Sequence, residues 1–240
     1  SDVCSSDLRA KAVLCPGLRM SLAVEAKPEE NESWIFEDGL RQYLEASVGG
    51  ADCVPAFTII HQATGNGEAV EYALKWVAEG SAPITESYVN LIPTAAGGTH
   101  VNGLRSGLID ALKEFCEFRD LLPRGVKITG DDIWDQCSYV LSVKLRDPQF
   151  AGQTKERLSS RQSAVFVAGV AKVVHHAGED GGEEVDGRAE EVAQLGARGE
   201  QRVHAVGDAR AVRRVVVRHR AVALLESAQE AQQRVGGHPQ

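Results

Sequence analysis

Between residues 18 and 172 the apolar positions of the chain recur with the periods of regular secondary structure. Runs that alternate at the strand period, or that are rich in β-branched and aromatic residues, predict strands. These runs are Leu18–Val24, Trp34–Phe36, Phe57–Ile60, Ala69–Val77, Glu86–Leu91 and Ser138–Leu145. In two of them one face is continuous and apolar: Val70, Tyr72, Leu74 and Trp76, and then Tyr139, Leu141, Val143 and Leu145. Glu71 and Lys75 fall on the other face of the first of these strands.

Spacings of three and four predict the helices. The strongest pattern runs from Thr99 to about Arg119, with Thr99 able to cap it and Leu121–Gly125 breaking it. Its apolar residues are Val101, Leu104, Leu108, Leu112 and Phe115. Further helices are expected to open at Glu37–Gly39, at Asp131–Trp134 and from Glu156 onward. Strands followed by a long helix, a strand and a helix predict an α+β layer arrangement without internal repeats.

The two ends of the chain differ from this middle part. Residues 1–8 resemble the in-frame translation of a sequencing-adapter oligonucleotide, and we interpret them as non-native. Residues 173–240 contain no Lys, Ile, Phe, Tyr, Trp, Met, Cys, Thr or Asn, and only one serine, Ser227. Apart from serine, all the residue types that remain have codons that can begin with G or C, and no Phe, Tyr or Trp is present to anchor a core. We therefore predict that 173–240 is an out-of-frame or chimeric tail.

Composition limits the classes of function. Hydrophobic residues make up 43% of the 240 residues, enough for a real core, and the formal net charge is −8. A protein that binds nucleic acid through its overall charge would be basic, so any DNA contact must be local. Five cysteines without a C-x-x-C pair, the lack of a His cluster and the lack of an apolar run of membrane length favour a cytoplasmic protein with no metal centre and no membrane partner.

Three ordered stretches carry a family resemblance. They are YVNLIPTAAGGTHVNGLR at 88–105, LLPRGVK at 121–127 and SYVLSVKLRDPQFAGQTKERLSS at 138–160. Together they resemble the B subunit of the bacterial type IIA DNA topoisomerases, in a form closer to topoisomerase IV than to its paralogue gyrase. The resemblance covers residues 9–172.

The resemblance implies a division of this region. Residues 9–49 resemble the C-terminal end of a GHKL-type ATPase domain, and 50–172 resemble the transducer domain, whose fold is similar to domain 2 of ribosomal protein S5. The ATP pocket with its magnesium-binding Asn is then expected before residue 9, and the Toprim domain after residue 172. ATP and Mg²⁺ are implied as cofactors of the complete protein, with none bound by this fragment alone. Implied partners are double-stranded DNA and, in a heterotetramer, the A subunit of topoisomerase IV with a second copy of the B subunit.

Two positions match the family loop that reaches the γ-phosphate of ATP, namely Gln153 and Lys155. Lysine supplies a mobile positive charge for a terminal phosphate, and glutamine adds neutral hydrogen bonding. Asp147–Gly152 gives the loop its turn chemistry. The loop position by itself favours a solvated pair of side chains; the resemblance reverses that interpretation.

Arg105 matches an arginine that the family points into its DNA-holding cavity, where it would contact phosphate without reading bases. A solvent-exposed helix arginine is the competing interpretation. For His100, beside the helix start, we expect a structural role, because no carboxylate or metal partner accompanies it.

Three functions stay open at this stage. The first is a fragment of the topoisomerase IV B subunit, inactive alone, with a fragment of the gyrase B subunit as its near alternative. The second is a free-standing S5-like nucleic-acid-binding module, which the acidic balance opposes. The third is a chimeric reading frame with no native activity.

Overall fold

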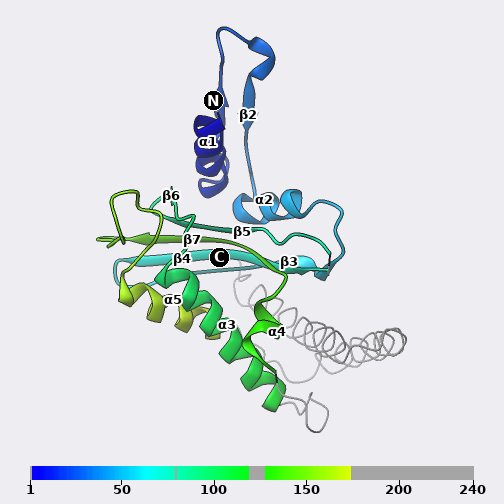
Figure 1. The fold of residues 1–240 in the computed structure, drawn as a ribbon, viewed down its shortest axis with the longest axis vertical. Helices are drawn as coiled ribbons and strands as arrows, with labels where there is room; N and C mark the ends of the chain where they lie inside the picture. The colour runs from blue at the N-terminus through cyan, green and yellow to red at the C-terminus, as the bar shows by residue number, and fades with distance from the viewer. Residues whose placement is uncertain (1, 79, 119–127, 174–240) are drawn as a thin grey trace, which may run out of the picture.

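A five-stranded sheet with helices on both faces forms the body of the molecule (Figure 1). The computed structural model describes residues 2–78, 80–118 and 128–173. In chain order the elements are α1 (Asp2–Leu14), β1 (Met20–Leu22), the 3-10 turn η1 (Pro28–Glu30), β2 (Glu32–Trp34), α2 (Gly39–Val48), β3 (Cys53–Thr64), β4 (Glu68–Val77), β5 (Thr85–Val89), β6 (Ile92–Pro93), α3 (Thr99–Phe118), α4 (Gly130–Trp134), β7 (Cys137–Leu145) and α5 (Arg161–Val173).

The main sheet has the strand order β3-β4-β7-β5-β6, and β1 pairs with β2 in a separate hairpin. Neighbours are antiparallel except β5 and β7, which run parallel from Thr85↔Tyr139 to Val89↔Val143. A parallel pair needs a crossover connection, and the segment that contains α3 and α4 supplies it. The structure therefore confirms the mixed α and β character that the sequence predicts.

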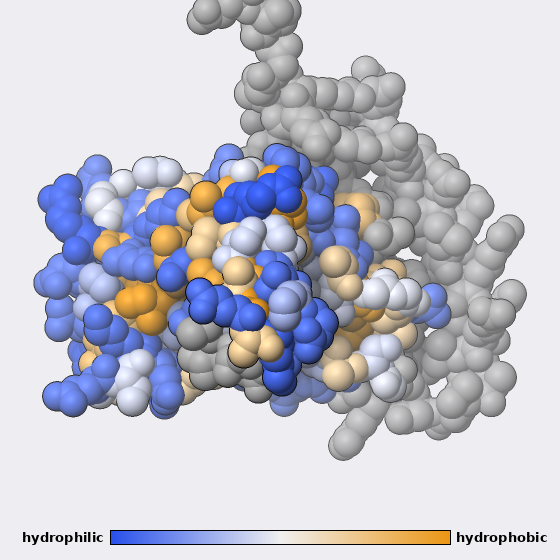
Figure 2. Space-filling model, turned by 90° about the horizontal axis from the view of Figure 1, so that it is seen from above, coloured by the Kyte–Doolittle hydropathy of each residue, from blue (hydrophilic) through white to orange (hydrophobic). Residues whose placement is uncertain are grey.

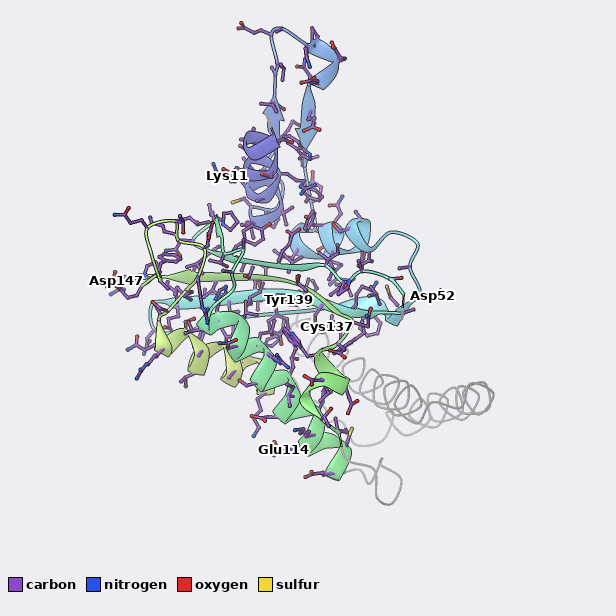
Figure 3. All side chains as sticks on the ribbon, viewed as in Figure 1. Lys11, Asp52, Glu114, Cys137, Tyr139 and Asp147 are labelled. Atoms are coloured by element: carbon purple, nitrogen blue, oxygen red, sulfur yellow. The ribbon has the colours of Figure 1, made fainter. Side chains whose placement is uncertain are left out.

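Each face of the sheet carries its own core. The apolar faces predicted for β4 and β7 lie together in the larger core, beneath α3 and α5. The smaller core joins α1 and α2 to the opposite face, through Ala73, Tyr88 and Val140. Figure 3 shows the two layers, with Lys11 of α1 on one side of the sheet and Glu114 of α3 on the other. Because both faces are covered, Lys75 is only 5% exposed although it lies opposite the apolar face.

Helices α3 and α5 approach each other closely through small residues. An ideal Cβ on Gly103 would lie 2.5 Å from the carbonyl oxygen of Ala164, and one on Gly107 would lie 2.5 Å from that of Ala168. Glycines four residues apart share one helix face, so the two form a continuous contact strip. At these two glycines the backbone of α3 therefore lies directly against the backbone of α5.

Two expectations near the helix ends are wrong. The last helix begins at Arg161 and not at Glu156, because residues 156–160 are not yet helical and Leu158 forms β-bridges with Gly98 and Phe150. Thr99 does not cap α3: its hydroxyl is buried and finds no partner among the described residues. The Gly98 carbonyl instead accepts the Asn102 N–H at 3.0 Å, so Gly98 occupies the capping position.

The strand boundaries also move. The strand expected at 34–36 is β2, which ends at Trp34, and the strand expected at 57–60 is the longer β3. Helix α4 gains a capping box in which Thr129 and Asp132 satisfy each other's backbone N–H groups.

Helix α1 begins at Asp2, inside the segment that the sequence marks as adapter-like, and Ser5 Oγ donates a hydrogen bond to Glu32 Oε2. This local structure does not test the non-native origin of residues 1–8, which stays a prediction. The LLPRGVK stretch and all of the predicted tail after Val173 lie outside the described residues.

The surface viewed from above shows apolar side chains as small patches among hydrophilic ones (Figure 2). Leu18 and Val165 are the exposed large hydrophobic residues of the described part. None of the helices in the described ranges has the length and apolar content that a bilayer crossing requires.

Candidate functional site

The loop that joins β7 to α5, residues 146–160, is closed at its base and exposed at its tip. Phe150 and Leu158 form an antiparallel bridge, and the Ala151 N–H donates to the Arg157 carbonyl at 2.9 Å. The Ser159 N–H donates to the Gln149 carbonyl at 2.8 Å. Leu158 is 1% exposed and anchors this base in the larger core, while every residue from 151 to 157 is exposed.

Gln153 and Lys155 both lie at this exposed tip. Lys155 has a φ of +57°, in the left-handed region that marks a tight reversal of the chain. Within the described residues its amine has no ion-pair partner. In Figure 1 the yellow-green segment that follows β7 arches past β6 toward the face that carries α1. The two predicted residues are thus accessible to a ligand presented from that side.

The base of the loop is joined to the start of α3. Gly98 and Leu158 form a parallel bridge, in which Leu158 N–H donates to Gly97 O and Thr99 N–H donates to Leu158 O, each at 3.0 Å. The Ala96 N–H also donates to Glu156 O at 3.0 Å. This bridge leaves no room for a side chain at position 98, since a Cβ on Gly98 would lie 2.5 Å from Leu158 N and still closer to its carbonyl oxygen.

Arg105 of α3 is engaged with α4. Its Nη2 lies 2.8 Å from Asp131 Oδ1, and its guanidinium lies 5.8 Å from the centroid of the Trp134 ring. The Arg105 side chain is still 43% exposed, so it remains accessible to solvent. A phosphate contact would have to compete with Asp131, and the DNA-cavity role stays a prediction.

His100 is completely buried, as expected for a structural residue. Its Nε2 lies 3.1 Å from Thr94 Oγ1, which in turn donates to the Ser87 carbonyl at 2.9 Å. This short polar chain connects α3 with β5 and the residue that follows β6. These hydrogen bonds fix the N-terminal end of α3, to which the base of loop 146–160 is joined.

We expect acid to weaken the fold through His100. Burial lowers the pKa of the imidazole from 6.5 to about 4, so the unfolded chain takes up this proton at a higher pH than the folded chain does. The stabilisation by neutral His100 is present above pH 6.5 and is lost as the pH falls through about 4. Between pH 6.5 and about 4, the unfolding free energy of His100→Gln, measured by urea denaturation, should depend less on pH than that of wild type. An unchanged slope would contradict this assignment.

A second polar cluster, missed by sequence reasoning, joins α1 and α2 to the sheet. The Glu86 carboxylate accepts the Tyr43 hydroxyl at 2.7 Å and the Tyr88 hydroxyl at 2.6 Å. Arg9 lies over the Tyr43 ring, 5.7 Å from its centroid. Burial, followed by the bond to Glu86, raises the pKa of Tyr43 to about 12, and the same causes raise the pKa of Tyr88. Both phenols therefore stay protonated and can donate at neutral pH.

The side chains at the tip of loop 146–160 suit an anion better than a metal ion. No set of three His, Cys, Asp or Glu side chains in the described ranges is placed to hold a metal. The loop tip offers the Lys155 ammonium and the Gln153 amide, and both can donate hydrogen bonds to phosphate oxygens.

Comparison with known proteins adds the family. The DNA gyrase B model matches residues 39–187, which are 149 of the 240 residues. The chain belongs to the DNA gyrase B family. The match continues past Lys172, where the sequence resemblance that we identified stops.

Relatives within the DNA gyrase B family are named as the B subunit of DNA topoisomerase 4. The protein of Haemophilus influenzae is 61% identical over 165 residues, which are 69% of this chain and 26% of the relative. Those of Escherichia coli and Pseudomonas aeruginosa are 59% and 57% identical, with the same shares. The chain therefore spans about a quarter of the length of these relatives.

Solved structures show that the fold is that of the ATPase region of this gyrase B family. The topoisomerase IV ATP-binding domain of Francisella tularensis matches with a TM-score of 0.62 and 31% identity, over 98% of this chain and 54% of that one. The 43K ATPase domain of Thermus thermophilus gyrase B matches in fold, with a TM-score of 0.63 and 24% identity, over 97% of this chain and 56% of that one.

Proposed function

We propose that residues 50–172 are the transducer domain of a topoisomerase IV B subunit, with the S5-like fold, and that residues 9–49 end its GHKL-type ATPase domain. In this proposal loop 146–160 senses the terminal phosphate of ATP held by the rest of that ATPase domain. The observation that carries it is the exposed Lys155 amine, which has no ion pair within the described residues, on a tip whose base is fixed to α3.

The side chains at the tip suit that task. The Lys155 ammonium would neutralise charge that builds up on the γ-phosphate during hydrolysis, and the Gln153 amide would orient a phosphate oxygen. Mg²⁺ in the complete protein would neutralise phosphate charge, but its ligands are expected outside this chain, because the loop tip offers hydrogen-bond donors and not a set of metal ligands. This chain alone is then expected to hydrolyse no ATP.

The fixed base would pass the state of the nucleotide onward. A shift of the tip would move Leu158, and through the Gly98 bridge the start of α3. Arg105, further along that helix, is the candidate that would meet DNA. In the complete heterotetramer, formed by two copies each of the A and B chains on double-stranded DNA, ATP binding would close a gate while one duplex passes through another. We place this decatenation and relaxation in the cytoplasm, where cysteines that form no disulfide, such as Cys15 and Cys53, are common.

A fragment of the gyrase B subunit is the nearer alternative, but the relatives at 57–61% identity carry the topoisomerase IV name. A free-standing nucleic-acid-binding module is the other alternative. The net charge of −8 opposes it, and Arg105 already has an acidic neighbour. A DNA and RNA shift assay across salt concentrations separates the two classes: tight, salt-sensitive binding by this chain alone would favour the module.

Lys155→Ala in the complete B subunit should lower ATP turnover about tenfold or more, the effect of losing one charge-assisted contact to phosphate. The thermal unfolding midpoint should stay at the wild-type value, because the side chain is exposed. Lys144→Ala is the matched control: Lys144 is also exposed, but lies on β7 and outside the loop, and turnover should not change. Wild-type ATP turnover in Lys155→Ala would contradict the proposal that loop 146–160 senses the γ-phosphate.

A further inference from the structure

The turn between β5 and β6 contains an asparagine whose side chain replaces a piece of strand. Asn90 and Leu91 both have positive φ, +49° and +67°, as a two-residue reversal between antiparallel strands requires. At this point the chain leaves β7, its parallel neighbour. Strand β7 continues for two more residues, to Leu145.

Asn90 fills the gap that the departing strand leaves. Its backbone N–H donates to Val143 O at 3.0 Å, as a continuing strand would. Its side-chain amide then behaves like the next peptide group: Nδ2 donates to Leu145 O at 2.8 Å, and Oδ1 accepts the Leu145 N–H at 2.9 Å. Both backbone polar groups of Leu145, a residue only 9% exposed, are therefore satisfied by one side chain.

Leu145 is also held from the other side, where it lies opposite Glu68 of β4. It is the last residue of β7, and the loop begins with the next residue, Arg146. Figure 3 shows Asp147 where the chain leaves the sheet, at the end far from Asp52. The loop thus has two roots: Leu145, fixed by Asn90, and Leu158, fixed by Gly98.

We infer that Asn90 is a positioning residue for Lys155, acting through the Leu145 root of the loop. This inference rests on the proposed function of the loop. A tip that must place one amine against a phosphate loses precision when either root can shift, and small misplacements of a reacting group are costly. Asn90 itself is not expected to touch the nucleotide.

The test uses two variants of the complete B subunit. Asn90→Asp keeps the size and the tolerance of positive φ but removes the Nδ2 donor, and Asn90→Gly keeps the turn and removes the whole amide. Each should lower kcat for ATP hydrolysis about fivefold to tenfold, as expected from loss of one or two hydrogen bonds, with KM for ATP unchanged. Asn66→Asp is the matched control, an exposed asparagine in the β3–β4 turn, and should leave turnover unchanged.

A double variant tests whether Asn90 works through Lys155. If it does, Asn90→Asp added to Lys155→Ala should cost nothing further. Hydrogen–deuterium exchange on the 240-residue chain gives an independent measurement. In that measurement Asn90→Gly should speed exchange at Leu145 and at residues 149–159, and leave β4 and the part of α3 that follows Thr99 unchanged.

The outcomes separate the two proposals. Wild-type turnover in Lys155→Ala defeats the proposed function. A loss in Lys155→Ala together with wild-type turnover in both Asn90 variants defeats only the inference. Losses that multiply in the double variant, or faster exchange over the whole sheet with a matching fall in thermal midpoint, also overturn it, because they indicate a merely structural residue.

Discussion

Gly98→Val should destabilise the fold by at least about 3 kcal/mol, from the summed costs of backbone strain and overpacking. Gly98 has a φ of +135°, which a β-branched residue hardly adopts. Its Cβ would also collide with the backbone of Leu158, 2.5 Å away at the nitrogen. That backbone cannot retreat, because it is hydrogen-bonded to Gly97 and Thr99. Urea denaturation followed by circular dichroism measures the loss.

Gly80→Val provides the matched control. Gly80 also has a positive φ, +93°, but its Cβ would meet nothing within 4 Å. The control should lose only the strain, on the order of 1–2 kcal/mol. If Gly98→Val does not fold, Gly98→Ala against Gly80→Ala makes the same comparison. Equal losses at the two positions would show that the contact with Leu158 does not constrain the fold.

Gly107→Val should cost at least about 2 kcal/mol by overpacking the contact between α3 and α5. A Cβ there would lie 2.5 Å from Ala168 O and 2.8 Å from Ala171 Cβ, so the two helices would have to separate. Gly169→Val is the control, in α5, with open space around its Cβ, and helix propensity makes it neutral or slightly stabilising. Thermal melting of both variants decides the matter: a Gly107→Val midpoint at the wild-type value would show that α5 can shift freely.

The local sequence pattern was sufficient to predict an element where one face of that element packs against one core. The period-two face of β4 and the three-to-four spacing of α3 both appear where they were predicted, because burial on one side imposes those periods. The pattern gave no sign that the opposite face of β4 is covered too, which is why Lys75 is buried. That covering comes from α1 and α2, and contacts between distant segments leave no local period.

The candidate site shows the same limit. Gln153 and Lys155 came from a family resemblance, since polar loop residues have no pattern of their own. The helix expected at Glu156 failed because Leu158 is used in bridges to Gly98, 60 residues away in the chain (158 minus 98). Asn90 is linked to Leu145 over 55 residues and would pass in the sequence for an ordinary turn residue.

The position of β7 in the sheet sets an order of events during synthesis. Strands β4 and β5 do not pair with each other, since β7 lies between them, and β7 is translated after every other described strand. Until residue 145 has left the ribosome, the edges of β4 and β5 that later pair with β7 stay unpaired. Unpaired strand edges are the surfaces most prone to wrong pairing. A ribosome that pauses before codon 137 would therefore hold the nascent chain in its most aggregation-prone form.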